Sequence, residues 1–385
     1  MRLTAGTVAP EMLLGVCAAF DGERLIAGDV AIRDGRIAGL GIEPGVGAHI
    51  AAPGFVDLQM NGFVGIDLQT ADAAAVRDMA PAVAATGVTA YQPTIITAPP
   101  SQMAAALAEF ARIEPEPGLP HVLPVHLEGP FLSPEFRGAH PQEALAAPSL
   151  ELLRALLDAG HIGYVTLAPE LPGALALVEE LRSRNVVVAL GHSNATAAEA
   201  DAAFAAGITA ITHAFNAMRA FHHREPGPVA RALERGDIWV TAIADPVHLH
   251  RTALHLLERA AGERFVAVSD AMVAAGLPEG EYTFGQFEVS LAGGRARLAD
   301  GRLAGSAATL DESVRVLVAL GVPLESTLAA VTSRPAAVIG DAELGRLRVG
   351  GPADIVVLDP ELHPVTTYIG GVPGGQQRTQ EAQIG

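Results

Sequence analysis

The chain of 385 residues contains no lysine, so all 25 of its basic residues are arginine. Against 43 acidic residues they leave a formal net charge of −18, which argues against nucleic acid as a partner. A bound phosphate would therefore have to be held by individual arginine and histidine side chains. The absence of lysine also excludes a metal site bridged by a modified lysine.

Cysteine and long apolar runs are equally scarce. The single cysteine, Cys17, excludes an intrachain disulfide and fits a reducing compartment. No apolar stretch is long enough to span a membrane, and the short one at residues 12–20 leads into a strand-like pattern, unlike a signal peptide. We therefore expect a soluble, cytoplasmic protein that has no membrane partner.

Both ends of the chain have strand-like patterns. Near the N-terminus, short apolar segments are separated by Asp21-Gly22 and Asp34-Gly35, pairs that favour tight hairpins. Residues 350–359 and 366–369 are again β-like. We predict a small β-sandwich domain built from residues 1–52 and 340–370, followed by a disordered tail over residues 371–385.

Between these ends, apolar segments alternate with alanine- and leucine-rich segments of helical spacing. Eight strands are predicted, at residues 51–57, 87–93, 122–128, 164–168, 186–191, 208–213, 238–245 and 265–270. Such alternation is typical of a (β/α)8 TIM-like barrel, an α/β fold with its active site at the carboxyl ends of the strands. The alternative, a doubly wound open sheet, needs a glycine-rich phosphate loop, which is missing after the first strand. We therefore predict a barrel over residues 53–339 as the catalytic domain.

Several predicted strands end in polar residues, and in a barrel these ends converge on one central mouth. Glu128, His192 and His213 end three different strands, and one glutamate with two histidines can bind a divalent ion while leaving a position open for water. A carboxylate at the end of a buried strand is costly unless it is paired or bound to a metal. One such histidine alone would mean little, but the shared position of these residues favours a metal site.

The motifs along the chain resemble those of a known family. Residues 53–57 (PGFVD), which follow an N-terminal β region, and Asp270 at the end of the eighth strand are similar to the amidohydrolase superfamily. Within it, five motifs resemble the N-acetylglucosamine-6-phosphate deacetylases and occur in the same order. They are HLEGPF at 126–131, GHSNAT at 191–196, HAFNAM at 213–218, REPG at 224–227 and LAGS at 303–306.

This resemblance implies roles for individual residues. Glu128, His192 and His213 would be the metal ligands, and Asp270 the catalytic acid and base. The implied substrate contacts are Ala139, His140, Asn216, Ala217, Arg224, His248, Leu303, Ala304 and Gly305. The resemblance also implies a homodimer in which Arg224 reaches the active site of the neighbouring subunit.

The number of metal ions depends on one departure from the superfamily. Many members hold a second ion with His-x-His after the first strand, whereas this chain has Gln59-Met60-Asn61. Amide oxygens are poor ligands for a transition metal, so we expect one divalent ion per subunit. Zn²⁺ is the first choice because one glutamate and two histidines suit it, with Fe²⁺ or another transition metal as the alternative.

The activity implied by the resemblance is hydrolysis of the N-acetyl group of N-acetyl-D-glucosamine 6-phosphate to D-glucosamine 6-phosphate and acetate. Its context would be amino-sugar catabolism and the recycling of cell-wall sugars. Asp270 would take a proton from the attacking water and return it to the departing amine. Two alternatives stay open: a related amidohydrolase that acts, for example, on N-acetylgalactosamine 6-phosphate, and a catalytically inactive barrel scaffold. A scaffold has no physical reason to keep buried charge, which argues against it.

Overall fold

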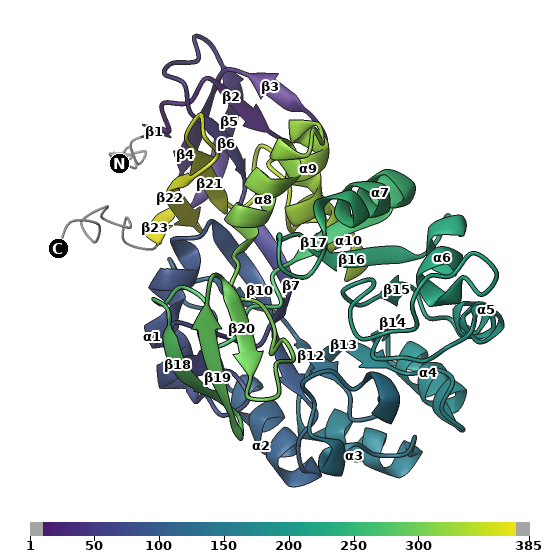
Figure 1. Ribbon diagram of the computed structural model, residues 1–385. Coiled ribbons are helices and arrows are strands. Elements are labelled where there is room, and N and C mark those ends of the chain that lie inside the picture. The colour runs from purple at the N-terminus through teal and green to yellow at the C-terminus, as the bar shows by residue number, and fades with distance from the viewer. Residues whose placement is uncertain (1–10, 375–385) are drawn as a thin grey trace.

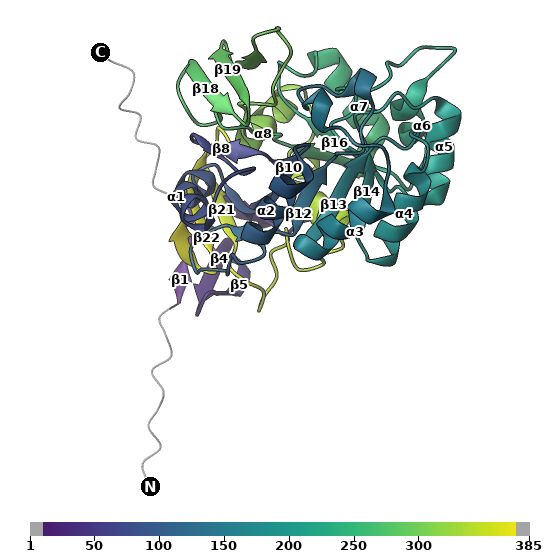
Figure 2. The same cartoon turned by 90° about the horizontal axis from the view of Figure 1, so that it is seen from below.

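The computed structural model describes residues 11–374, and at its centre lies a parallel barrel of eight strands (Figures 1 and 2). Each strand pairs with the next one along the chain, because a helix returns the chain to the same end of the barrel each time. The barrel strands are β7 (Phe55–Met60), β10 (Val88–Ile96), β12 (Val125–Glu128), β13 (Ile162–Leu167), β14 (Val187–Leu190), β15 (Ala210–Ile211), β16 (Trp239–Ile243) and β17 (Phe265–Val268). The prediction of a (β/α)8 barrel is confirmed.

Helices cover the outside of this barrel, and α2 to α7 form its outer rim in Figure 1. Several begin at side chains that cap the first turn: Ser149 accepts from Leu152 N before α3, and Thr196 forms a capping box with Glu199 before α5. The helices are α1 (Ala73–Ala84), α2 (Pro100–Phe110), α3 (Leu150–Ala159), α4 (Ala174–Ser183), α5 (Ala197–Ala206), α6 (Gly227–Glu234), α7 (Arg251–Ala261), α8 (Leu310–Ala319), α9 (Leu324–Val331) and α10 (Ser333–Val338).

The barrel closes differently between its first and last strands, at a junction we call the seam: β7 with Asn61, and residues 269–271 after β17. Instead of a continuous ladder, one parallel bridge joins Met60 to Ala271. Side chains complete the closure, because Ser269 N donates to Asp57 Oδ1 over 3.2 Å and Ser269 Oγ donates to the carbonyl of Gln59 over 3.2 Å. The seam therefore holds polar groups close to the mouth of the barrel.

An antiparallel sheet that was not predicted stands between β17 and α8. Its strands are β18 (Gly280–Phe284), β19 (Phe287–Ala292) and β20 (Arg295–Leu298). Gly285 and Gly293-Gly294 form the two turns with positive φ, and the segments between them alternate in character. This pattern was a readable signal of two hairpins. Four smaller elements also lie near the mouth: β8 (Gly62–Phe63), β9 (Ile66–Asp67), and the 3₁₀ turns at Pro134–Phe136 and Gln142–Ala144.

The two ends of the chain together form a separate small domain of two sheets. In Figures 1 and 2 its N-terminal strands, in purple, lie beside its C-terminal strands, in yellow. The smaller sheet has the order β1 (Met12–Leu13), β4 (Asp29–Arg33), β5 (Arg36–Ile42). The larger one has the order β23 (Val372–Gly374), β22 (Pro364–Ile369), β21 (Ile355–Leu358), β6 (Ile50–Pro53), β2 (Ala18–Phe20), β3 (Leu25–Ala27). Apolar side chains of both sheets, including Val30, Ile37, Ala51 and Ile355, pack together between them, as a β-sandwich requires.

The structure corrects two details of the prediction. The predicted strand 51–57 is two strands, β6 in the small domain and β7 in the barrel, separated at Gly54. A Cβ on Gly54 would lie 2.1 Å from Thr89 Oγ1, so only glycine fits where the chain passes between the domains. Residues 372–374 of the predicted disordered tail form β23, while residues 375–385 lie outside the described residues.

The predicted boundaries at 52/53 and 339/340 stay a prediction. Within residues 11–374, no helix is long and apolar enough to cross a membrane.

Candidate active site

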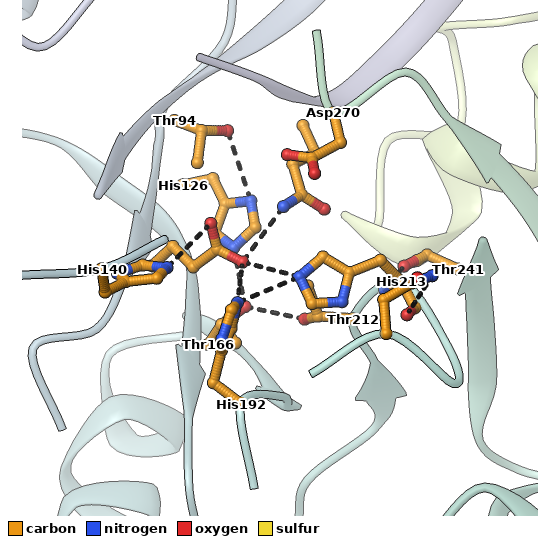
Figure 3. Close-up of polar contacts among 12 residues, drawn as sticks. Thr94, His126, His140, Thr166, His192, Thr212, His213, Thr241 and Asp270 are labelled. Carbon is orange, nitrogen blue, oxygen red and sulfur yellow. Dashed lines mark hydrogen bonds and ion pairs between the residues drawn. The ribbon is translucent and has the colours of Figure 1, made fainter. Parts of the chain in front are cut away.

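The predicted metal ligands meet at the mouth of the barrel. Glu128 is the last residue of β12, and His192 and His213 each follow the end of their strand by two residues. Glu128 Oε1 lies 3.2 Å from His192 Nε2 and 3.0 Å from His213 Nε2, and the two Nε2 atoms are 3.1 Å apart. Figure 3 shows the imidazoles turned toward one central carboxylate. All three side chains are buried.

This triangle of atoms has the size of a metal site. Ligand atoms held tetrahedrally about 2.0–2.2 Å from a zinc ion lie roughly 3.3–3.6 Å apart, a few tenths of an ångström more than the sides of the triangle. His192 Nδ1 lies 3.0 Å from the carbonyl oxygen of Phe136, which only accepts, so Nδ1 carries the hydrogen and Nε2 presents its lone pair. These residues fit a divalent ion.

His140 stands beside the triangle as a second candidate ligand. Glu128, His140 and His192 also bring ligand atoms within 4.8 Å of one another. His140 Nε2, however, lies 3.7 Å from the other oxygen of Glu128, whereas His213 Nε2 lies 3.0 Å from Glu128 Oε1 and 3.1 Å from His192 Nε2. These distances favour His213 over His140 as the third ligand, so that the role of His213 stays a prediction that the geometry supports.

The pKa values of the clustered side chains favour the protonation states that bind a cation. Burial alone would raise the pKa of Glu128, but the neighbouring His192 and His213 side chains hold it well below its usual value. Burial, with the neighbouring His192 imidazole as the second cause, lowers the pKa of His140 to about 3. His140 is therefore neutral at pH 7, and Glu128 is an anion among imidazoles.

Asp270 faces the cluster from the seam, two residues beyond the end of β17. Burial raises its pKa to about 6, and the negative charge of Glu128 adds to this effect. Asn61 Nδ2 donates to Asp270 Oδ1 over 2.7 Å. The carboxylate is thus fixed in one orientation and titrates near the pH at which a general base works best.

The backbone is strained where three of these side chains turn inward. His192, His213 and Asp270 have φ of 48°, 31° and 49°, in the left-handed region that costs an L-residue roughly 1–2 kcal/mol. Each strained residue follows a parallel strand and turns its side chain into the mouth. Strain kept at three corresponding positions points to function, because the fold alone does not need it.

A cavity of about 350 Å³ opens over the cluster. Its wall contains all but one of the predicted substrate contacts: Ala139, His140, Asn216, Ala217, His248, Leu303, Ala304 and Gly305. They come from the loops after β12, β15 and β16 and from the segment after β20. The unpredicted sheet adds Phe284 from β18, so this sheet forms part of the wall.

His248 is held in place from behind. Asp245 Oδ2 lies 2.8 Å from His248 Nδ1, and Asp245 Oδ1 accepts from the backbone nitrogens of Val247 and His248. Ser306 Oγ also donates to Asp245. Because Nδ1 is engaged with the carboxylate, Nε2 is the atom that His248 offers to the cavity.

Arg224 is the one predicted contact outside the cavity wall. It is exposed in the segment between β15 and α6, and its guanidinium Nη1 contacts His223 Nε2 at 2.8 Å. The structure does not bring it to the other predicted site residues of the same chain. That it reaches a neighbouring subunit stays a prediction.

Among the lining residues that were not predicted as contacts, two make polar contacts that shape the site. Arg302, directly before the LAGS motif, donates to the carbonyl of Gly138 and pairs with Asp300, which ties the segment after β20 to the loop after β12. Asn61 was considered only as a replaced metal ligand, yet it contacts Asp270. Long-range contacts of this kind leave no local pattern in the sequence.

With this geometry in place, comparison with known proteins identifies the class. The model of the amidohydrolase family matches residues 50–379, and the chain belongs to this family of metal-dependent hydrolases. Among curated relatives, it is 39% identical to an N-acetylglucosamine-6-phosphate deacetylase of Danio rerio, over 84% of this chain and 83% of the relative. It is also 39% identical to an N-acetylgalactosamine-6-phosphate deacetylase of Escherichia coli O157:H7, over 84% and 87% of the two chains.

A solved structure gives the same result. The chain superposes with a TM-score of 0.89 and 31% identity on a mutant N-acetyl-D-glucosamine-6-phosphate deacetylase from Mycobacterium smegmatis, in complex with N-acetyl-D-glucosamine-6-phosphate. The match covers 96% of this chain and 100% of the other.

Proposed function

We propose that this chain hydrolyses the N-acetyl group of N-acetyl-D-glucosamine 6-phosphate to D-glucosamine 6-phosphate and acetate, in amino-sugar catabolism and the recycling of cell-wall sugars. One observation carries the proposal: the compact triangle of Glu128, His192 and His213, with Asp270 facing it beneath a cavity of about 350 Å³. The names of the similar proteins supply the substrate class.

Glu128, His192 and His213 would hold one divalent ion, with Zn²⁺ as the first choice and Fe²⁺ as the alternative. When bound, such an ion would supply Lewis acidity, which polarises the amide carbonyl and lowers the pKa of water to about 7. Gln59 Nε2 donates to Glu128 Oε1 over 3.1 Å, which limits rotation of this carboxylate.

Asp270 is the proposed general base and acid. Its carboxylate takes one proton from the attacking water and returns it to the nitrogen of the departing amine. A pKa of about 6 suits both steps, because the group is ionised at neutral pH but still a competent base.

His140 is the proposed donor to the oxyanion. Thr97 N donates to His140 Nδ1 over 3.3 Å, and Thr97 Oγ1 lies 2.9 Å from the same nitrogen. With Nδ1 as the acceptor from both groups, the hydrogen lies on Nε2. A neutral imidazole with a fixed Nε2–H stabilises negative charge that develops on the carbonyl oxygen. A well-aimed donor of this kind contributes about 3–4 kcal/mol in the transition state.

Phosphate recognition would fall to Arg224 of a neighbouring subunit and to His248, in a homodimer. The formal charge of −18 provides no long-range attraction for a dianion, so recognition depends on short-range contacts. A guanidinium offers a planar fork of donors that matches phosphate oxygens. A cytoplasmic location, favoured by the single cysteine, completes the proposal.

A second substrate has a specific observation in its favour, namely the relative named N-acetylgalactosamine-6-phosphate deacetylase. The deciding experiment measures acetate release from both epimers and from unphosphorylated N-acetylglucosamine, with the metal content determined in parallel. We expect the highest kcat/KM for N-acetylglucosamine 6-phosphate. A higher value for the galactosamine epimer would select the second substrate. No release from any of the three, by a chain with its metal bound, would support an inactive scaffold.

A further inference from the structure

Asn61 has one half of its amide engaged and the other half unpaired. It lies one residue beyond β7, in the cavity wall, with only 3% of its surface exposed. Nδ2 donates to Asp270 Oδ1 over 2.7 Å. Oδ1 is buried, and no group within the described part of the chain donates to it. An acceptor left in this state is costly unless a ligand completes it.

The side chain has little freedom to escape this arrangement. Asn61 N donates to the carbonyl of Ala271 over 2.7 Å, directly after Asp270. The backbone therefore holds Asn61 and Asp270 next to each other across the seam. Because the two amide atoms are bonded to the same carbon, Oδ1 must lie close to the Asp270 carboxylate, in a residue that lines the cavity.

Gln59 provides an internal comparison. Gln59 lies in β7 and Asn61 directly after it, and both side chains contact carboxylates at the mouth of the barrel. Gln59 Nε2 donates to Glu128 Oε1, the metal-ligand side, while Asn61 Nδ2 donates to Asp270, the proton-transfer side. The two amides thus serve different carboxylates of one site.

We propose that Asn61 is a positioning residue of the reaction: Nδ2 holds the Asp270 carboxylate, and Oδ1 accepts a hydrogen bond from the attacking water. This inference rests on the proposed function. The water has two hydrogens, of which one goes to Asp270 as the new C–O bond forms and the carbonyl electron pair moves onto oxygen. The other hydrogen points at Asn61 Oδ1, which aims the lone pair at the carbonyl carbon. When the C–N bond then breaks, Asp270 returns its proton to nitrogen.

A merely structural role, closure of the seam, is the competing explanation. The backbone bonds of Asn61 and the bonds of Ser269 close the seam without the Asn61 side chain. The test must therefore measure kcat and KM separately, and it must show whether the effect of changing Asn61 depends on Asp270.

The experiment compares Asn61→Ala, Asp270→Asn and the double variant, with acetate release from N-acetylglucosamine 6-phosphate as the readout. We expect Asn61→Ala to lower kcat by about 10- to 100-fold, the range for a lost hydrogen bond to a charged group, with KM within about twofold. In the Asp270→Asn background, the same change should cost less than about threefold, because the residue that Asn61 positions is already disabled. Independent, multiplying losses, or an unchanged kcat in the single variant, would overturn the inference.

Gln59→Ala is the matched comparison, since it removes an amide of the same strand that faces the metal ligand. We expect weakened metal retention on dialysis for Gln59→Ala and full retention for Asn61→Ala, with thermal unfolding as a check on folding. Loss of metal from Asn61→Ala would assign it to the metal site and contradict the inference. If the unmodified chain releases no acetate, the proposed function falls together with this inference. An active chain that tolerates Asn61→Ala overturns this inference alone.

Discussion

Two parts of the molecule carry the proposed site, and they are built differently. The strand-end cluster, defined as Glu128, His192, His213 and Asp270, lies on the barrel, with every side chain held by at least one polar contact at 3.2 Å or less. Arg224 lies exposed in the segment between β15 and α6, with a histidine neighbour as its side-chain contact. The barrel thus holds the proposed catalytic groups within one chain, whereas the proposed phosphate contact, Arg224, lies on a loop that does not line the cavity of its own chain.

Removal of the metal should reduce activity the most, and it should act through the strand-end cluster alone. Dialysis against a chelator is expected to abolish acetate release, because the amide would lose its Lewis acid. One equivalent of Zn²⁺ should restore it, and elemental analysis should find one ion per chain. Two tightly bound ions per chain would contradict the inference drawn from Gln59 and Asn61.

The substitution Asp270→Asn should cause the second largest loss of activity. The amide has the size of the carboxylate but accepts no proton, so kcat is expected to fall by about 10²–10⁴-fold. Metal content and thermal unfolding should stay close to those of the unmodified chain, because Glu128, His192 and His213 are unchanged. Turnover within a few-fold of the original would place the base elsewhere.

The substitution Arg224→Ala tests the proposed phosphate contact on the exposed loop. KM for the phosphorylated sugar should rise far more than KM for the unphosphorylated one, by about tenfold or more, since a charge-assisted bond is lost. Arg235→Ala, at a half-buried arginine that pairs with Asp237 outside the cavity wall, is the control and should change neither KM value. Equal weakening of both substrates by Arg224→Ala would mean that the phosphate contact lies elsewhere.

Mixing the two variant chains tests whether Arg224 acts between subunits. In a mixed dimer of Arg224→Ala and Asp270→Asn chains, the site with an intact Asp270 receives an intact Arg224 from its neighbour. Activity at low substrate concentration should therefore exceed that of either variant alone. Without such a gain, the arginine either acts within its own chain or does not contact the substrate.

The smallest effect is the pH dependence below neutrality. Asp270 must be ionised to act as a base, and its pKa is raised to about 6, so kcat should rise with pH and level off above this value. About one pH unit below the midpoint, kcat should be down by about tenfold. The positive charge of a bound ion moves the midpoint toward lower pH. A profile that is flat from pH 4 to 8 would contradict the assignment of Asp270.

The barrel could be predicted because its pattern is local. Apolar strands and amphipathic helices repeat along the chain, and the glutamate and histidines that end the strands converge in any barrel of this kind. The sheet at residues 280–298 was missed although its glycine turns are readable, because eight strands had already accounted for a barrel. The split at Gly54 was also missed, since the segment from Ala51 to Val56 has one apolar pattern, and β6 and β7 are distinguished by their pairing partners.

The sequence by itself determined which groups are present: no lysine, amides at 59 and 61 in place of a second pair of imidazoles, and polar side chains at the ends of the strands. Only the tertiary structure decided how these groups are paired. Asn61 meets Asp270 across 209 positions of the chain, and Gln59 meets Glu128 across 69. Such pairings depend on which strands lie next to one another and on the side to which each side chain turns. Closure of the barrel fixes both at once, by placing the first strand beside the last.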